Sequence, residues 1–311
     1  MRLRWRILLL GLWLGFFATA GAHAAATLVI VSSERSGAYL EVTEALMGEL
    51  ERTGLPRAEV LHLTSLEFSA TGPLAPKLFV ALGTQAALAL GKAELRAPVL
   101  STLLPRAGFE RVLLESKRKV SSQFSALYLD QPLSRQLDLI ELALPDVRRV
   151  GSLWGPESQG QASALKELAQ SRGLDLVGAR VTGNETLFPG LNQVLENSDL
   201  LLALADPQIY NSGSIQNILL ASFRAKVPMM AFSPAYVRAG ALLALHVSPS
   251  QIGMQAAAIA RGVLQGKSLS AAPTYSQDFQ VSVNKHVARS LGLSLDADEL
   301  RARLWRRESS R

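Results

Sequence analysis

The stretch KLFVALGTQAALAL at residues 77–90 decides the fold. Residues 77–82 are almost wholly apolar, which is typical of a strand buried on both faces of a sheet. Gly83 allows a sharp turn, and the alanines and leucines that follow are strong helix formers. The stretch therefore predicts a strand, a turn and a helix, which is the repeating unit of a parallel sheet.

The same unit recurs on both sides of this stretch. In a first series, strands are predicted at residues 27–31, 59–63, 77–82 and 98–103, with helices at 38–52 and 84–90 and about one helical turn between residues 63 and 77. In the helix at 38–52, the side chains expected to face inward are Leu40, Ala45, Leu46 and Leu50. A second series has strands at 149–153, 174–181, 199–205 and 228–232, with helices at 158–171 and up to 225. Apolar strands that alternate with helices predict two parallel sheets, each covered on both faces.

The boundary between the two series is predicted near residues 122–132, where an extended stretch meets a polar turn that ends in proline. A helix at 133–144 leads into the second series. After residue 232, the chain offers a strand at 241–246, a helix at 250–264, an extended segment at 279–283 and a helix at 284–291. These elements exceed what a simple second sheet needs. They indicate a chain that crosses back between two lobes.

The amino terminus has the layout of a secretory signal. Arg2, Arg4 and Arg6 precede an apolar run at residues 7–17, and small residues end at Ala24. We expect residues 1–24 to be a signal peptide, cleaved after Ala24. The alternative, an uncleaved anchor, is disfavoured because the apolar run is shorter than the roughly 20 residues that span a bilayer. The chain has no cysteine, which excludes lipid attachment at a cysteine, disulfides and cysteine-ligated zinc. The sequence thus predicts a soluble periplasmic protein that is not a lipoprotein.

The charge of the mature chain is small. Removing the leader removes three arginines and no acidic residue, so the net charge of +6 falls to +3 over 287 residues. No basic stripe with interleaved aromatics occurs, so nucleic acid is not an expected partner. Four arginines near the C-terminus accompany Glu299 and Glu308 and predict a solvated helix end; they are Arg301, Arg303, Arg306 and Arg307.

Motifs for catalysis are missing. Residues 262–268 superficially resemble a phosphate loop, but their glycine spacing is too short and the segment ends a helix. No G-x-S-x-G or G-x-G-x-x-G pattern occurs, and His62, His246 and His286 have no carboxylate or histidine at metal-ligand spacing. The sequence therefore predicts no catalytic residue, no metal site and no cofactor. We do not expect an enzyme.

Polar residues gather at the predicted carboxyl ends of the strands, where open α/β sheets bind ligands. From the first series they are Ser32, Ser33, Gly83, Thr84, Ser101 and Thr102, and from the second Trp154, Gly155, Asp206, Pro207 and Ser233. Three tyrosines just beyond these edges, Tyr39, Tyr128 and Tyr210, are candidates for an aromatic wall. Serine, threonine and aspartate also cap helices, so each residue alone has a structural alternative. Together they predict a small-molecule site between the lobes.

From about residue 27 to residue 293, the chain resembles the tryptophan/tyrosine-binding type of the ABC-transporter substrate-binding protein family, which has the type I periplasmic binding fold. The matching stretches are residues 82–87, 136–154, 199–207, 226–242, 250–257 and 273–284. The resemblance implies two doubly wound lobes, residues 25–125 with 246–275 and residues 126–245 with 276–311. It places a three-segment hinge near Ala126, His246 and Ser276.

The resemblance also implies a function. A monomer would close on an amino acid or similar metabolite and then dock onto an ABC permease in the inner membrane. The match supports Gly83, Thr84 and Gln85 as an anion-facing loop and Asp206 as a polar contact from the second lobe.

The chain departs from the family at residues 102–106. Where the family commonly has Thr-Asp-Pro-Val, this chain has Thr102-Leu103-Leu104-Pro105-Arg106, so the aspartate expected to meet the ligand's amine is missing. Arg106 has two interpretations: it favours an acidic ligand, or it is a solvated arginine in a loop. We prefer the second, because exposed arginine is the ordinary case. An exported sensor or adaptor with a degenerate cleft is the alternative function. A hydrolase would need a nucleophile with its base, which the sequence does not offer.

Overall fold

The structure is a computed structural model that describes residues 26–310, so the predicted signal peptide lies outside the described residues. Its first sheet has six strands, all paired in parallel, in the order β11-β5-β4-β3-β1-β2. Their bounds are β1 Leu28–Ser32, β2 Val60–Thr64, β3 Leu78–Leu82, β4 Val99–Thr102, β5 Phe124–Tyr128 and β11 Thr274–Tyr275. The strands β1 and β3 are fully buried, as their unbroken apolar runs predict.

Helices cover both faces of the first sheet. On one face lie α1 (Ala38–Arg52) and α10 (Pro249–Leu264), and on the other α2 (Ser65–Ala70), α3 (Thr84–Lys92) and α4 (Arg106–Ser116). In α1, Val42, Leu46 and Leu50 face the sheet. The expectation for Leu40 is wrong, because its position on the helix turns it outward and leaves it 46% exposed.

The second sheet also has six strands, in the order β12-β10-β9-β8-β6-β7. Their bounds are β6 Arg149–Trp154, β7 Asp175–Arg180, β8 Leu200–Leu202, β9 Met229–Ala231, β10 Leu243–His246 and β12 Gln280–Val283. All neighbours are parallel except β12, which runs antiparallel to β10. On one face lie α5 (Leu133–Ala143), α6 (Ala162–Gln170), α11 (Lys285–Ser290) and α12 (Ala297–Ser309), and on the other α7 (Asn184–Glu196), α8 (Ile215–Ala225) and α9 (Pro234–Ala239).

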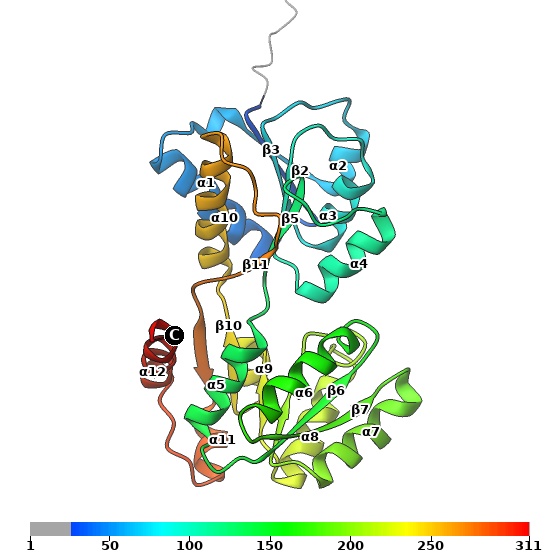
Figure 1. The fold of residues 1–311 in the computed structure, drawn as a ribbon, viewed down its shortest axis with the longest axis vertical. Helices are drawn as coiled ribbons and strands as arrows, with labels where there is room; N and C mark the ends of the chain where they lie inside the picture. Colours follow the sequence, from blue (N-terminus) through cyan, green and yellow to red (C-terminus); the bar gives the residue numbers. More distant parts are fainter. Residues whose placement is uncertain (1–25, 311) are drawn as a thin grey trace, which may run out of the picture.

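The predicted fold class is confirmed: each sheet with its helices forms one α/β lobe, and the two lobes are stacked along the longest axis (Figure 1). In each lobe the first strand lies between the second and third, so the carboxyl edge has a switch point between β1 and β3 and another between β6 and β8. The sequence prediction omitted α4, α7 and α9. Pro189 interrupts the pattern of α7, and α9 is only six residues long.

Three connections join the lobes. Residues 129–132 lead from β5 to α5, residues 247–248 from β10 to α10, and residues 276–279 from β11 to β12. The strand β5 stays in the first sheet through Tyr128, past the boundary expected at residue 125. The helix α12, red in Figure 1, packs on α5 and β12 close to these connections.

Arg135 of α5 ties two of the connections to α12. Its side chain is buried, and its Nη1 donates to Gln131 Oε1 at 2.6 Å and to the carbonyl oxygen of Ser276 at 2.9 Å. Its Nε donates to Glu308 Oε1 at 2.6 Å, and the guanidinium lies 4.7 Å from the ring centre of Phe279. One arginine thus fixes the first and third connections against the C-terminal helix.

The C-terminal arginines differ from one another. Arg301, Arg303 and Arg306 are exposed, as a solvated helix end predicts. Arg307 is not: its Nε lies 3.2 Å from Oδ1 of the fully buried Asp138, and its Nη2 donates to Glu141. The expectation is wrong for Arg307 because α12 turns this side chain toward α5, where two carboxylates offset its burial.

The contact between α1 and α10 depends on a glycine. A Cβ at Gly253 would lie 2.6 Å from the carbonyl oxygen of Val42 and 2.7 Å from Ala45 Cβ. We expect Gly253→Ala to lower the free energy of unfolding by about 2 kcal/mol, since the helices must separate. Gly48→Ala is the matched control in α1, where a Cβ meets nothing within 4 Å, and it should stabilise by about 0.5–1 kcal/mol. Urea denaturation measures both, and effects of the same sign would contradict the packing.

Candidate functional site

A cavity of about 250 Å³ lies between the two lobes, beside both switch points. The first lobe contributes Thr84, Pro105, Gly108 and Arg111, and the second contributes Glu157, Ala205, Asp206, Pro207, Tyr210, Phe232 and Tyr236. A recess of about 310 Å³ in the first lobe shares Thr84 and Arg111 with this cavity; its other lining residues are Ser33, Glu34, Tyr39, Gln85, Leu88, Val112 and Glu115. A molecule in the cavity would therefore contact both lobes at once.

The first-lobe wall is fixed around Gly83. The Ser33 hydroxyl donates to the carbonyl oxygen of Leu82 at 3.0 Å and accepts from the N–H of Ala86 at 3.1 Å, so Ser33 holds the start of α3. Gly83 has φ 86°, and a Cβ there would lie 2.7 Å from Ser33 Oγ and 2.8 Å from a ring carbon of Tyr39. Only glycine allows this close approach. The amides of the first turn of α3 thereby begin at the cavity wall, where Thr84 lies.

Asp206 fixes the second-lobe wall. It is 1% exposed, and its Oδ2 accepts from the N–H of Glu157 at 3.1 Å and from the N–H and hydroxyl of Ser158, both at 2.9 Å. Its Oδ1 accepts from the N–H of Gln208 at 3.0 Å. A Cβ at Gly155 would lie 2.6 Å from Oδ2, so this glycine leaves the space that the carboxylate fills. Asp206 thus holds the loop that follows β6 in place.

An ion pair crosses the cavity from one lobe to the other. Arg111 of α4 donates through Nη1 to Oε1 of Glu157, which belongs to the loop after β6. Arg111 Nε also lies 3.7 Å from Glu115 Oε1 on its own helix. Burial raises the pKa of Glu157, and the charge of Arg111 opposes that rise. The helix α4 lies on the side of the first lobe that faces the second (Figure 1), which brings Arg111 within reach.

Three aromatic rings form one wall of the cavity. Phe232 follows β9 and packs edge-on against Tyr210 at 6.0 Å and against Tyr236 at 5.1 Å between ring centres. The Tyr236 hydroxyl donates to the carbonyl oxygen of Tyr210 at 3.1 Å. The Tyr210 hydroxyl has no partner among the described residues, and burial raises its pKa. The wall offers stacking surface beside charged groups of both signs.

The family model for ABC transporter substrate-binding proteins matches residues 73–302 of this chain. The chain belongs to that family. A tyrosine-binding protein of Clostridioides difficile (strain R20291) is 22% identical over 232 residues, which cover 72% of this chain and 66% of that protein, just under two thirds of its length.

Solved structures show the same fold. A ligand-free, open substrate-binding protein with adhesive properties from Clostridium difficile has a TM-score of 0.69 and 19% identity, over 88% of this chain and 96% of that one. An ABC domain from Streptococcus pneumoniae in complex with L-Trp has a TM-score of 0.62 and 18% identity, over 88% and 97%. At these sequence identities, the structural similarity establishes the fold of this chain, which is the type I periplasmic binding fold.

Of the site residues predicted from the sequence, Thr84, Asp206 and Tyr210 line the interlobe cavity of this substrate-binding protein, as does Pro207. Ser33, Tyr39, Gln85 and again Thr84 line the adjoining recess. Gly83 and Gly155 shape the two walls without lining them. Of the fifteen predicted residues, four thus line the interlobe cavity and three more line only the recess of the first lobe. Their contact with a ligand stays a prediction.

The remaining predicted residues line neither space. Ser32 and Thr102 are fully buried, and their hydroxyls contact His62 Nε2 at 2.9 Å and the carbonyl oxygen of Leu127 at 3.0 Å. Ser101 Oγ is buried without a partner among the described residues. Ser233 caps α9. Tyr128 packs against Tyr275 and Phe109, and Trp154 lies over Gly178 in the second-lobe core.

Seven residues that line the cavity were not predicted as site residues. Four of them carry a charge or an aromatic ring, namely Arg111, Glu157, Phe232 and Tyr236, and the other three are Pro105, Gly108 and Ala205. The signal for Glu157 and Phe232 was present. Glu157 follows the predicted strand at 149–153 as Gly155 does, and Phe232 is the last residue of the predicted strand at 228–232, next to Ser233. Arg111 was missed with α4, and Tyr236 with α9. The expectation that Arg106 lies in a loop is wrong. Arg106 is the first residue of α4, and its Nε donates to Glu110 Oε1 at 2.7 Å.

A titrating group lies at the first connection between the lobes. Asp130 Oδ1 accepts from the N–H of Arg106 at 2.9 Å, and burial raises the pKa of Asp130 from 3.8 to about 6. A native pKa above the unfolded value means that the native state holds the proton more tightly, so stability falls as pH rises from about 4 to about 6 and then stays level. We expect Asp130→Asn to remove this fall and to stabilise the protein by about 1–2 kcal/mol near pH 8, the partial exposure of Asp130 limiting the gain. Thermal unfolding of both proteins across this pH range tests it, and parallel curves would contradict it.

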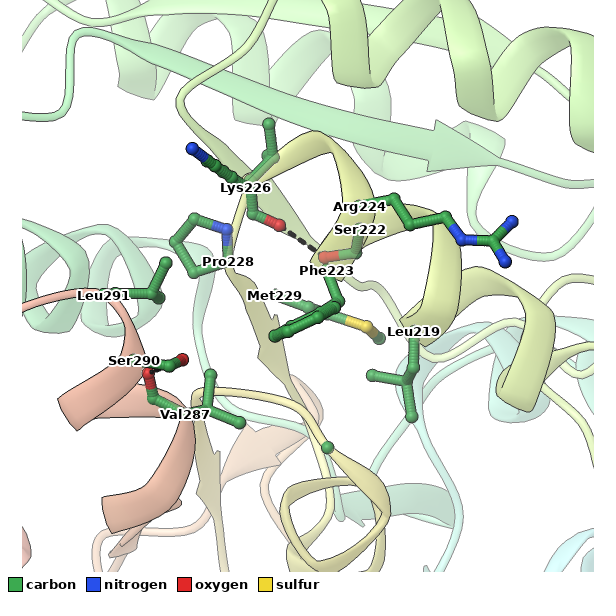
Figure 2. Close-up of a pocket in the computed structure, with 12 residues that line it drawn as sticks. Leu219, Ser222, Phe223, Arg224, Lys226, Pro228, Met229, Val287, Ser290 and Leu291 are labelled. Carbon is green, nitrogen blue, oxygen red and sulfur yellow. Dashed lines mark hydrogen bonds between the residues drawn. The ribbon is translucent and has the colours of Figure 1, made fainter.

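A larger pocket, of about 470 Å³, lies at the opposite edge of the second sheet, between the end of α8, the start of β9 and α11. Figure 2 shows that its wall is mainly apolar, with Phe223, Met229, Val287 and Leu291 around the hollow and the guanidinium of Arg224 directed away from them. The hydroxyls of Ser222 and Ser290 donate to carbonyl oxygens of the pocket's own backbone. No polar groups converge there, so we do not place the ligand in this pocket.

Within residues 26–310, no group of three or more histidine, cysteine or acidic side chains is placed to hold a metal ion. Nor does any helix in this part of the substrate-binding protein have the length and apolar character needed to cross a membrane.

Proposed function

We propose that this chain is the periplasmic solute-binding subunit of an ABC-type uptake system and that it closes on a small metabolite of the amino-acid type. One observation carries the proposal: the interlobe cavity places a guanidinium, carboxylates and an aromatic wall around one space that both lobes bound. A ligand held there would stabilise the closed arrangement of the lobes. The relatives named above as a tyrosine-binding protein and as a complex with L-Trp support a ligand of this class.

The wider assignments form part of the same proposal. The protein is exported, its signal peptide is cleaved after Ala24, and the mature protein is a monomer. It delivers its ligand to a permease in the inner membrane and catalyses no reaction. The two bodies that move are the two predicted lobes, with bounds set by the strands of each sheet: residues 26–128 with 249–275, and residues 133–246 with 280–310. The three connections supply the hinge, with Arg135 holding two of them together.

A titration followed by small-angle scattering tests the proposal. We expect the purified protein to become more compact with at least one of the twenty amino acids, and native mass spectrometry of protein taken directly from cells to show a bound metabolite. Arg149→Gln, at the far edge of the second sheet, is a control that leaves compaction unchanged. No compaction and no bound metabolite would contradict the proposal.

That negative result would favour the second candidate, an exported sensor or adaptor that acts through a membrane partner. The observation in its favour is the direct ion pair between Arg111 and Glu157, which links the two lobes through the protein's own side chains. Co-purification with a histidine kinase or an outer-membrane receptor would then be the next measurement.

A further inference from the structure

We infer that Arg111 and Glu157 read the two charges of a zwitterion: Arg111 binds the ligand's carboxylate, Glu157 binds its ammonium group, and an aromatic side chain packs on Phe232 and Tyr236. The inference rests on the proposed function of binding an amino-acid-type metabolite. It names the residues that would recognise such a ligand and the class of side chain that fits.

Charge placement is the first step. Arg111 is the one cationic side chain among the described residues that line the cavity and its recess. Glu157 faces it from the other lobe, and the pair has 44% and 12% of its side-chain surfaces exposed. Opposite charges on two facing walls complement a molecule that carries an anion and a cation on one carbon. An α-amino acid has this arrangement.

The second step is the choice of carboxylate. Two acidic residues line the interlobe cavity, Asp206 and Glu157. Asp206 already accepts four hydrogen bonds from its own lobe, so it has little capacity for a ligand's ammonium group. Glu157 has its side chain directed across the cavity to Arg111. The carboxylate available to a ligand is therefore that of Glu157.

The loop after β4 supplies no carboxylate to the interlobe cavity. Residues 102–106 offer no acidic side chain, and Leu103 there has φ 56°, in the left-handed region that costs a leucine about 1 kcal/mol. The loop presents Pro105 to the cavity instead. The loop therefore offers no charged group for a ligand's ammonium, whereas the carboxylate of Glu157 enters the cavity from the second lobe. The ligand's ammonium group would consequently help to draw the lobes together.

Ligand insertion would replace one ion pair by two. Arg111, now shared between Glu157 and Glu115, would gain a carboxylate of its own, and Glu157 would gain an ammonium group. Both new pairs form in a space that closure shields from water, where hydrogen bonds to charged groups are strong. The aromatic wall lies beside the ion pair and offers ring surface on which an aromatic side chain of the ligand can pack. We therefore expect the ligand to carry an aromatic side chain.

Calorimetry with matched ligands tests the roles separately. The probes are L-tyrosine and L-tryptophan, their amines tyramine and tryptamine, and their desamino acids 3-(4-hydroxyphenyl)propanoate and indole-3-propanoate. We expect Glu157→Gln to weaken binding of the amino acid and of the amine by about 10- to 100-fold. The affinity for the desamino acid should change by less than about twofold. Arg111→Gln should weaken binding of the amino acid and of the desamino acid by the same factor and leave the affinity for the amine unchanged.

The controls separate the possible failures. Equal losses for all three ligand types would mean that the pair only holds the lobes together, and would overturn the inference. So would unchanged binding by both variants, although the proposed function would stand. If the unaltered protein binds neither amino acid, the inference is overturned, and the scattering titration with all twenty decides the proposed function. Glu157→Asp, which keeps a carboxylate, should still favour ligands with an ammonium group, and it serves if Glu157→Gln fails to fold.

Discussion

Substitution of Asp206 by alanine is expected to lower the free energy of unfolding by about 3–4 kcal/mol and to abolish ligand binding. The buried carboxylate accepts hydrogen bonds from three backbone N–H groups and one hydroxyl, at 2.9–3.1 Å. Alanine would leave these donors without a partner in a dry place, which costs far more than the loss of an exposed bond. The loop that carries Glu157 would also lose its anchor. Urea denaturation and calorimetry measure the two effects.

Two further variants define the cause. Asp206→Asn keeps one acceptor and the size of the side chain, so its loss of stability should be about 1–2 kcal/mol. Asp146→Ala removes an exposed aspartate from the same lobe and should change stability by less than about 0.5 kcal/mol. If Asp206→Ala unfolds at the same urea concentration as the unaltered protein, Asp206 does not organise this wall.

Arg135→Ala is the second large effect that we expect, about 3 kcal/mol of lost stability together with a looser hinge. The substitution removes three hydrogen bonds and the packing of the guanidinium on Phe279, and it leaves buried acceptors of Gln131 and Ser276 unpaired. Because these groups belong to two interlobe connections, hydrogen exchange at residues 276–279 and in α12 should speed up. Mass spectrometry of the exchanging protein follows these segments directly.

Arg301→Ala is the matched control on α12, since Arg301 is exposed. It should change the free energy of unfolding by less than about 0.5 kcal/mol and leave the hydrogen exchange rates of these segments unchanged. Unaltered exchange at the connections in Arg135→Ala would show that the arginine does not restrain the hinge.

Most strands of both sheets could be predicted because their signal is local, whereas the two-residue strand β11 (Thr274–Tyr275) was not predicted. Residues 78–82 and 200–202 are apolar throughout, which is typical of parallel strands buried on both faces, and each segment is followed by a small residue, Gly83 or Ala203. The helix at Ala38–Arg52 was predicted at its observed bounds. Short or interrupted helices were missed, since α9 has only six residues and α7 contains a proline.

The candidate site was predicted in part for the same reason. The rule that ligands bind at the carboxyl edge of such sheets found Thr84, Asp206 and Tyr210. It also selected Ser101 and Thr102, which belong to the same edge by sequence but point into the sheet's own packing. Strand position fixes which edge a residue occupies, whereas the pleat and the neighbouring helices decide which side it faces.

The sequence by itself determined the two α/β lobes, the crossing of the chain between them and the edge at which a ligand would bind, because each follows from patterns within about ten residues of one another. Only the tertiary structure decided what meets inside the cleft. Arg111 and Glu157 are 46 positions apart and belong to different lobes. Their pairing depends on how two separately folded bodies face each other, and that is a property of long-range packing that no local pattern encodes.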